Sequence, residues 1–266
     1  MFVQNPETPN IGTSTQGSTL LVPAVSIGNV PQLAVDLLIN TLQTSRIGIL
    51  DSPSLTPISG TAGYDHLGSE TRSLPLEVYQ TKDAKWTILQ QRSPPLPKHH
   101  RKFASELLEY IKSGGFSRVV VLASSDAALR TDALIDGSQI RTLSVDCLDE
   151  ELAARLKELS LGELSSEASG YSTGGGADGL KPTLRRLHAA GVTRPLVELC
   201  KQAGVPIFAM VSFVNEGDNI PDAIALANAA NTVLGVADTG RSEVPQWRPP
   251  QSWQWLMPSA VPDELF

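Results

Sequence analysis

Arg118–Ala123 reads RVVVLA, a nearly continuous run of β-branched and aliphatic residues. Such a run is typical of a strand that is covered on both of its faces. The preceding residues 103–112 carry an apolar stripe at helical spacing, which stops at the glycine pair 114–115, as helices often do. A helix that leads into a buried strand predicts an α/β fold, with a mixed, largely parallel sheet covered by helices.

Patterns on either side of this unit predict further strands and helices. A second buried strand, PIFAMVSFV, is expected at 206–214, and alternating residues at 76–79 and 86–91 predict a hairpin. The other expected elements are strands at 19–25 and 46–50 and helices at 30–42, 151–161, 182–190, 193–203 and 222–234.

We expect these elements to form a single α/β domain over residues 1–266. Its expected irregular parts are a flexible N-terminus at about 1–17, mobile loops at about 51–73 and 162–180, and a C-terminal tail at about 237–266. The second loop contains the triplet Gly174–Gly176, which lacks the lysine and hydroxyl residue of a P-loop and the spacing of a dinucleotide fingerprint. We interpret the triplet as a flexible loop or a close backbone approach.

Composition limits the kinds of partner. The chain has 266 residues, 21 of them basic and 28 acidic, for a net charge of −7. This balance argues against a nucleic acid or an anionic membrane as the main partner. Residues 1–17 lack the basic-then-apolar order of a signal peptide, and no apolar run approaches a membrane span. We therefore expect a cytoplasmic protein.

Metal and cofactor sites are not predicted. The two cysteines, Cys147 and Cys200, share no CxxC spacing, so we expect buried free thiols. The histidines are also not spaced as metal ligands; they are His66, His99, His100 and His188. No cofactor is expected.

Three carboxylates gather in SFVNEGDNIPDA, Ser212–Ala223: Glu216, Asp218 and Asp222. They could bind a metal or do acid/base chemistry, but the spacing fails that of a calcium loop. Acidic and amide side chains ahead of a helix also accept its unpaired N–H groups, and proline suits its first turn. We favour this structural interpretation.

The same arrangement precedes the helix expected at 30–42. Gly28, Asn29 and Pro31 lead into that helix as Gly217, Asn219 and Pro221 lead into the later one, where Asp218 also lies. Glycine allows a sharp turn, and asparagine tolerates left-handed geometry and caps helices. We predict that both sets are structural helix starts.

A further candidate site follows the RVVVLA strand, where α/β enzymes place ligand-binding groups. Ser124, Ser125 and Asp126 stand there, but no G-x-S-x-G motif accompanies them and no histidine is placed by sequence to activate a serine. Ordinary turn capping explains the same residues. No catalytic residue is assigned.

The C-terminal part is unusually aromatic, with Trp247, Trp253 and Trp255 close together between prolines. Such a segment is either packed against its own domain or kept for a partner. The chain then ends on Leu265 and Phe266, whose free carboxylate is a group that partner pockets can capture.

Four blocks of sequence, in order, resemble the proteasome assembly chaperone 2 family. They cover about a third of the chain: LLVPAVSIGNVPQLAVDLL at 20–38, VVVLASSD at 119–126, FVNEGDNIPDA at 213–223, and W-x-x-P-x-S-W at 247–253 with the final LF. The combination is specific, whereas each block alone is not.

The resemblance implies a non-enzymatic, ATP-independent chaperone that needs no cofactor. Such a protein forms a heterodimer with proteasome assembly chaperone 1 and promotes assembly of the α-ring of the 20S core particle, in the cytoplasm and the nucleus. The family's fold is similar to the nucleoside phosphorylase sandwich, without its catalytic residues.

The resemblance also assigns a role to the end of the chain. The family's C-terminal tails enter pockets between proteasome α subunits, where the terminal carboxylate pairs with a lysine, so Leu265 and Phe266 are the expected partner-binding residues. This tail departs from the activator pattern of a hydrophobic residue, tyrosine and any residue, because Leu265 stands at the tyrosine position.

Two other functions remain open at this stage. The chain could be a small-molecule enzyme of the nucleoside phosphorylase kind, using Ser124, Ser125, Asp126 and Glu216. It could also be a general adaptor without preference for α subunits. Fold resemblance alone does not carry the enzyme alternative.

Overall fold

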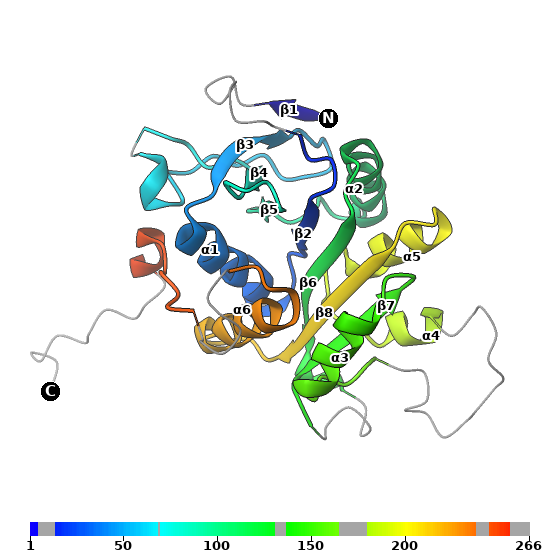
Figure 1. Cartoon of the computed structure of the whole chain (residues 1–266). Helices are drawn as coiled ribbons and strands as arrows, with labels where there is room; N and C mark the ends of the chain where they lie inside the picture. Colours follow the sequence, from blue (N-terminus) through cyan, green and yellow to red (C-terminus); the bar gives the residue numbers. More distant parts are fainter. Residues whose placement is uncertain (5–13, 69, 131–136, 165–179, 238–244, 256–266) are drawn as a thin grey trace, which may run out of the picture.

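The computed structural model describes residues 1–4, 14–68, 70–130, 137–164, 180–237 and 245–255, and all that follows concerns these residues. They form one eight-stranded sheet, in the order β1-β3-β4-β5-β2-β6-β8-β7, with helices on both faces (Figure 1). The strands are β1 Phe2–Gln4, β2 Thr19–Pro23, β3 Ser45–Leu50, β4 Leu76–Gln80, β5 Trp86–Gln91, β6 Arg118–Asp126, β7 Ile140–Val145 and β8 Ile207–Val214.

The sheet is mixed, as the sequence predicts. Its four central strands, β5, β2, β6 and β8, are parallel to one another. Antiparallel pairs complete both sides: β1 with β3, β3 with β4, β4 with β5, and β7 with β8. The predicted α/β class and the β4–β5 hairpin are confirmed, and the parallel pairing is confined to the centre.

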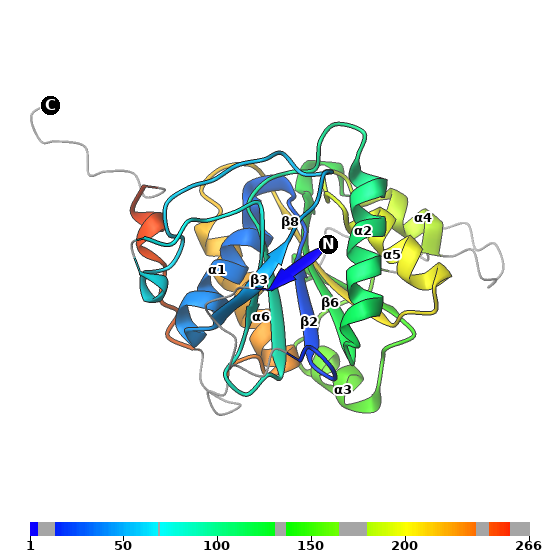
Figure 2. The same ribbon diagram turned by 90° about the horizontal axis from the view of Figure 1, so that it is seen from above.

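Helices cover the two faces of the sheet as separate layers (Figure 2). One layer contains α1 Val30–Leu42, α3 Glu150–Glu158 and α6 Ile220–Leu234, and the other contains α2 His100–Gly114, α4 Leu180–Arg185 and α5 Thr193–Gln202. Short 3-10 helices are η1 Ile27–Asn29, η2 Asp65–Leu67, η3 Ala127–Leu129 and η6 Gln251–Trp255. In this part of the chain, no helix is both long and apolar enough to cross a membrane.

Strand β6 shows why its sequence is almost uniformly apolar. Val119 and Val121 pack in the core beneath α2 and α5, while Val120 and Leu122 pack in the core beneath α1 and α6. All four are at most 1% exposed. Because alternate side chains of a strand point to opposite faces, a strand between two helical layers needs apolar residues at every position.

Two strands were not predicted from the sequence. β7 carries Arg141, Thr142 and Ser144 between its apolar residues, so it lacks the continuous apolar pattern of the central strands. β1 has only three residues and lies within the segment expected to be flexible, but it pairs with β3. Both strands lie at ends of the sheet, where only one side is paired.

Candidate functional site

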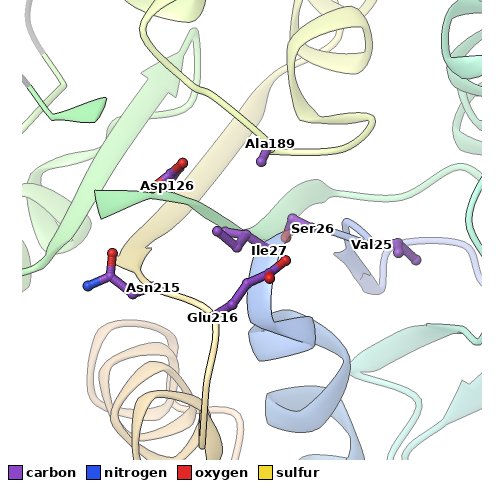
Figure 3. A pocket seen from close by; sticks show the side chains of 7 residues that line it. All are labelled: Val25, Ser26, Ile27, Asp126, Ala189, Asn215 and Glu216. Atoms are coloured by element: carbon purple, nitrogen blue, oxygen red, sulfur yellow. The ribbon is translucent and has the colours of Figure 1, made fainter. Parts of the chain in front are cut away.

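The C-terminal ends of β2, β6 and β8 meet at one edge of the sheet, because these strands are parallel. Residues at or just after these strand ends, together with Ala189 from the loop between α4 and α5, line an open depression of about 650 Å³ (Figure 3). The lining consists of Val25, Ser26, Ile27, Asp126, Ala189, Asn215 and Glu216. The depression therefore brings together Asp126 and Glu216, two residues of the enzyme alternative.

The serine hydroxyls at this edge already make hydrogen bonds. Ser124 Oγ donates to the carbonyl of Ile27 at 2.6 Å and lies 2.8 Å from Ser26 Oγ. Ser125 Oγ donates to the carbonyl of His188 at 2.9 Å. Both Ser124 and Ser125 are fully buried. Their hydroxyls tie β6 to the neighbouring loops, and His188 takes part through its backbone.

The carboxylates near the depression support turns. Asp126 Oδ1 accepts a hydrogen bond from the backbone of Ala128 at 2.9 Å, at the start of η3. Asp218 Oδ1 accepts one from the backbone of Ile220 at 3.2 Å, at the start of α6. Glu216 is exposed. Among the described side chains, no group of three His, Cys, Asp or Glu could hold a metal ion.

The two predicted helix starts pack against each other. Gly28 and Asn29 have positive φ angles of 68° and 52°, and a Cβ on Gly28 would lie only 2.6 Å from Asn219 Oδ1. The absence of a side chain at Gly28 therefore lets the turn before α1 approach the turn before α6. Pro31 and Pro221 each stand in the first turn of their helix.

The asparagines do not cap the helices in the way the sequence suggested. Neither the Asn29 nor the Asn219 side chain accepts a hydrogen bond from a backbone N–H of the first turn of its helix, although Asn29 Oδ1 accepts one from Gln32 Nε2 at 3.1 Å. The Asn219 amide instead donates to the carbonyl of Asn215 at 2.8 Å and to Asp222 Oδ2 at 3.0 Å. Asn219 thus holds together the turn that precedes α6, and Gly217 lies within this turn.

Residues 245–255, which we term the C-terminal strap, pack against the domain. Arg248 exchanges hydrogen bonds with α1: its carbonyl accepts from Asn40 Nδ2 at 3.0 Å, and its N–H donates to Thr41 Oγ1 at 2.9 Å. Trp247 Nε1 donates to Asn228 Oδ1 of α6 at 2.7 Å, and the Trp253 side chain is 1% exposed. Of the two alternatives for the aromatic segment, packing on its own domain holds for Trp247 and Trp253.

The strap is anchored by a buried carboxylate in the middle of α1. Asp36 accepts hydrogen bonds from Tyr64 Oη at 2.7 Å, Gln90 Nε2 at 2.6 Å and Trp253 Nε1 at 3.1 Å. Arg92 completes the cluster with an ion pair of 3.0 Å. These donors come from the loop before β4, from β5 and the residue after it, and from the strap, so one side chain joins four segments.

The negative charge of Asp36 is balanced within the cluster. The guanidinium of Arg92 compensates the carboxylate and also lies 5.2 Å from the centre of the Tyr64 ring. Burial raises the pKa of Tyr64 well above its ordinary value, with Arg92 acting against this and Asp36 adding to it. The Tyr64 hydroxyl therefore remains a donor at neutral pH.

This cluster was not predicted from the sequence, although the sequence contains one sign of it. Asp36 interrupts the apolar run AVDLLI of the helix predicted at 30–42. A charged residue on a buried helix face needs a partner. The sequence could have indicated that such a partner exists, but not that it would be Arg92.

The other candidate residues are dispersed. Cys147 and Cys200 are free thiols and Cys200 is buried, as predicted, but Cys147, which was also expected to be buried, is only half-buried. His66 Nε2 lies 2.9 Å from the carbonyl of Thr44, and His99 Nδ1 lies 3.0 Å from that of Pro97. The triplet Gly174–Gly176 and the terminal Leu265 and Phe266 lie outside the described residues.

Comparison with known proteins assigns the fold to a family. The family described as the PAC2 family matches residues 20–239. Proteins named Proteasome assembly chaperone 2 from Danio rerio and Homo sapiens are 36% identical over 257 residues and 33% identical over 256 residues. The alignments span 95% of this chain and 96% of the Danio rerio protein, and 94% and 95% for the human one.

A solved structure agrees at the level of the fold. Pyrococcus furiosus PbaB, described as an archaeal proteasome activator, superposes with a TM-score of 0.58 at 19% identity and covers 89% of each chain. The described sheet and its two helical layers are thus those of a known protein architecture.

Proposed function

This chain belongs to the PAC2 family, and on that basis we propose that it is a proteasome assembly chaperone. The observation that carries the proposal is the identity of 36% to a protein of that name over nearly the whole of both chains. The serines and carboxylates at the strand ends, which support turns, are compatible with a protein that acts by binding.

In finer detail, we propose that the chain forms a heterodimer with proteasome assembly chaperone 1 and binds proteasome α subunits. The pair would promote assembly of the α-ring of the 20S core particle, in the cytoplasm and the nucleus. The C-terminal tail would add affinity through Leu265 and Phe266, because a tethered second contact raises the effective concentration. This detail rests on the family resemblance.

The experiment for the tail removes Leu265 and Phe266. We expect weaker binding of the heterodimer to immobilised α-ring in surface plasmon resonance, with unchanged co-purification of assembly chaperone 1. Equal affinity of the truncated and full chains would rule out the tail contact. Failure of the full chain to co-purify with assembly chaperone 1 would rule out the heterodimer.

The depression at the strand ends is the feature that favours a second candidate function, that of a small-molecule enzyme. Asp126 and Glu216 line it together, and its position at strand ends is where α/β enzymes bind ligands. The enzyme alternative predicts that a nucleoside with phosphate raises the melting temperature of the protein. We expect no such increase, since the neighbouring serine hydroxyls are committed to backbone carbonyls.

A further inference from the structure

An apolar pocket of about 480 Å³ lies between β1, the end of β3 and helix α2. It shares no residue with the depression at the strand ends. Its walls include the side chains of Phe2, Leu50, Leu76, Phe103 and Leu107. The volume falls within the range of ligand-binding pockets, and apolar walls are typical of them.

One polar group of this pocket has no partner. Tyr110 lines the pocket and is 7% exposed, and its hydroxyl makes no hydrogen bond among the described residues. Its ring is held in place by Phe2 and Phe116, whose ring centres lie 5.8 and 5.5 Å away. The hydroxyl is closed off from solvent, so an occupant of the pocket would meet the ring of Tyr110 and not its hydroxyl.

Strand β1 offers backbone groups beside the pocket. It is the terminal strand of the sheet and lies next to α2 (Figures 1 and 2). Met1 and Asp51 exchange both of their backbone hydrogen bonds, so the N–H and C=O of Phe2 point away from β3. In the part of the chain that the structure describes, no strand pairs with that side.

The rim of the pocket is acidic. Asp51 and Glu109 are exposed lining residues. Glu106 also lines the pocket, and it accepts hydrogen bonds from Ser52 and Ser54 of the loop after β3. The amino group of Met1 is the only positive charge among the lining residues. An occupant that carries positive charge beside an apolar group is therefore favoured over an acidic one.

We propose that β1 and this pocket bind an extended segment of a protein partner. The segment pairs with the outward N–H and C=O of Phe2, places a large apolar side chain in the pocket against the ring of Tyr110, and carries lysine or arginine beside it. Addition of a strand to a free sheet edge, with pockets that select alternate side chains, is an established mode of peptide recognition. Phe2 connects the two parts, since its backbone forms the edge and its side chain lines the pocket.

The test uses the full chain and synthetic peptides, followed by NMR of the tyrosine ring signals. The first peptide is acetylated and amidated, with leucine at its centre, valine on either side and lysine at both ends. The second replaces both lysines with glutamate, and the third replaces the central leucine with alanine. We expect the first peptide to shift the Tyr110 signals most strongly, and the other two to bind several-fold more weakly.

Matched variants locate the binding. Ser113 lines the pocket at the exposed side of α2, whereas Ser105 lies on the same helix but not in the pocket, and each hydroxyl donates to a carbonyl of its own helix. S113W should abolish binding of the first peptide, and S105W should leave it unchanged.

Several outcomes would overturn the proposal. These are a Tyr110 signal that none of the peptides shifts, equal loss of binding in S113W and S105W, and tighter binding of the glutamate peptide than of the lysine peptide. A change of the Tyr110 signals with protein concentration alone would make a second copy of this chain the occupant instead.

Discussion

Asp36 is a carboxylate in the middle of a buried helix, and its four partners come from three other segments of the chain. We predict that D36N lowers the free energy of unfolding by about 3–5 kcal/mol, because it leaves the Arg92 guanidinium buried without its counter-ion. Urea denaturation at neutral pH measures this loss. The exposed substitution E158Q on α3 serves as the control and should change stability by less than about 0.5 kcal/mol.

A second substitution at the same cluster tests the bond to the strap. W253F keeps an aromatic ring but removes the indole N–H, and should cost about 1.5–3 kcal/mol, as for hydrogen bonds to charged groups. In the D36N background the cost of W253F should fall, because the charged acceptor is then absent. Additive effects in this double-mutant cycle would contradict a direct interaction.

The two thiols should differ in reactivity. Cys200 is fully buried, and burial raises the pKa of its thiol to about 12. The reactive thiolate is therefore almost absent at neutral pH. We predict that a thiol reagent modifies Cys147, which is half-buried, and reaches Cys200 only after denaturant is added. Mass spectrometry of digested protein distinguishes the two sites, and rapid native labelling of Cys200 would contradict the prediction.

At the scale of elements, substitutions of two glycines test how closely the turns before α1 and α6 pack against each other. Gly28 and Gly204 have similar φ angles of 68° and 65°, but only at Gly28 would an added Cβ meet other atoms, those of Asn219. We predict that G204A costs about 1–2 kcal/mol, the penalty of a left-handed conformation. G28A should cost about 1–3 kcal/mol more, from overpacking. Equal losses in thermal or urea unfolding would show that the two turns separate readily.

Sequence patterns predict elements in proportion to how strongly those elements are buried. β6 and β8 lie between two helical layers, so their runs of apolar residues identified them directly. β7 pairs on one side only, with β8, and mixes polar with apolar residues. Its sequence therefore lacks the continuous apolar run that identifies a buried strand. Tertiary position thus decided which strands could be predicted.

The candidate site was predictable only in part, for a physical reason. That polar residues would gather at the ends of parallel strands follows from the direction of those strands, and Asp126 and Glu216 do meet there. What the side chains do at that edge depends on distances across loops. Ser124, for example, donates to Ile27, 97 positions away in the sequence.

At the scale of the whole molecule, the C-terminal strap should act as part of the domain. We predict the effect of removing it by comparing a chain that ends at residue 255, which keeps the strap, with one that ends at residue 244. A chain ending at residue 244 should melt about 10 °C lower, because it leaves the site of the buried Trp253 empty and Asp36 without one donor. Circular dichroism during heating measures both, and equal melting temperatures would show that the strap is dispensable.

The bond between Asp36 and Trp253 also has a consequence for the order of events in folding. It joins positions 217 residues apart. Closing so long a stretch of chain costs conformational entropy, which is offset only once the contact has formed. During synthesis the N-terminal part emerges first, so Asp36 of α1 cannot accept its hydrogen bond from Trp253 until that much later residue has been made. We therefore expect the last step of folding to be the docking of the strap, with mutations there accelerating unfolding and leaving the folding rate nearly unchanged.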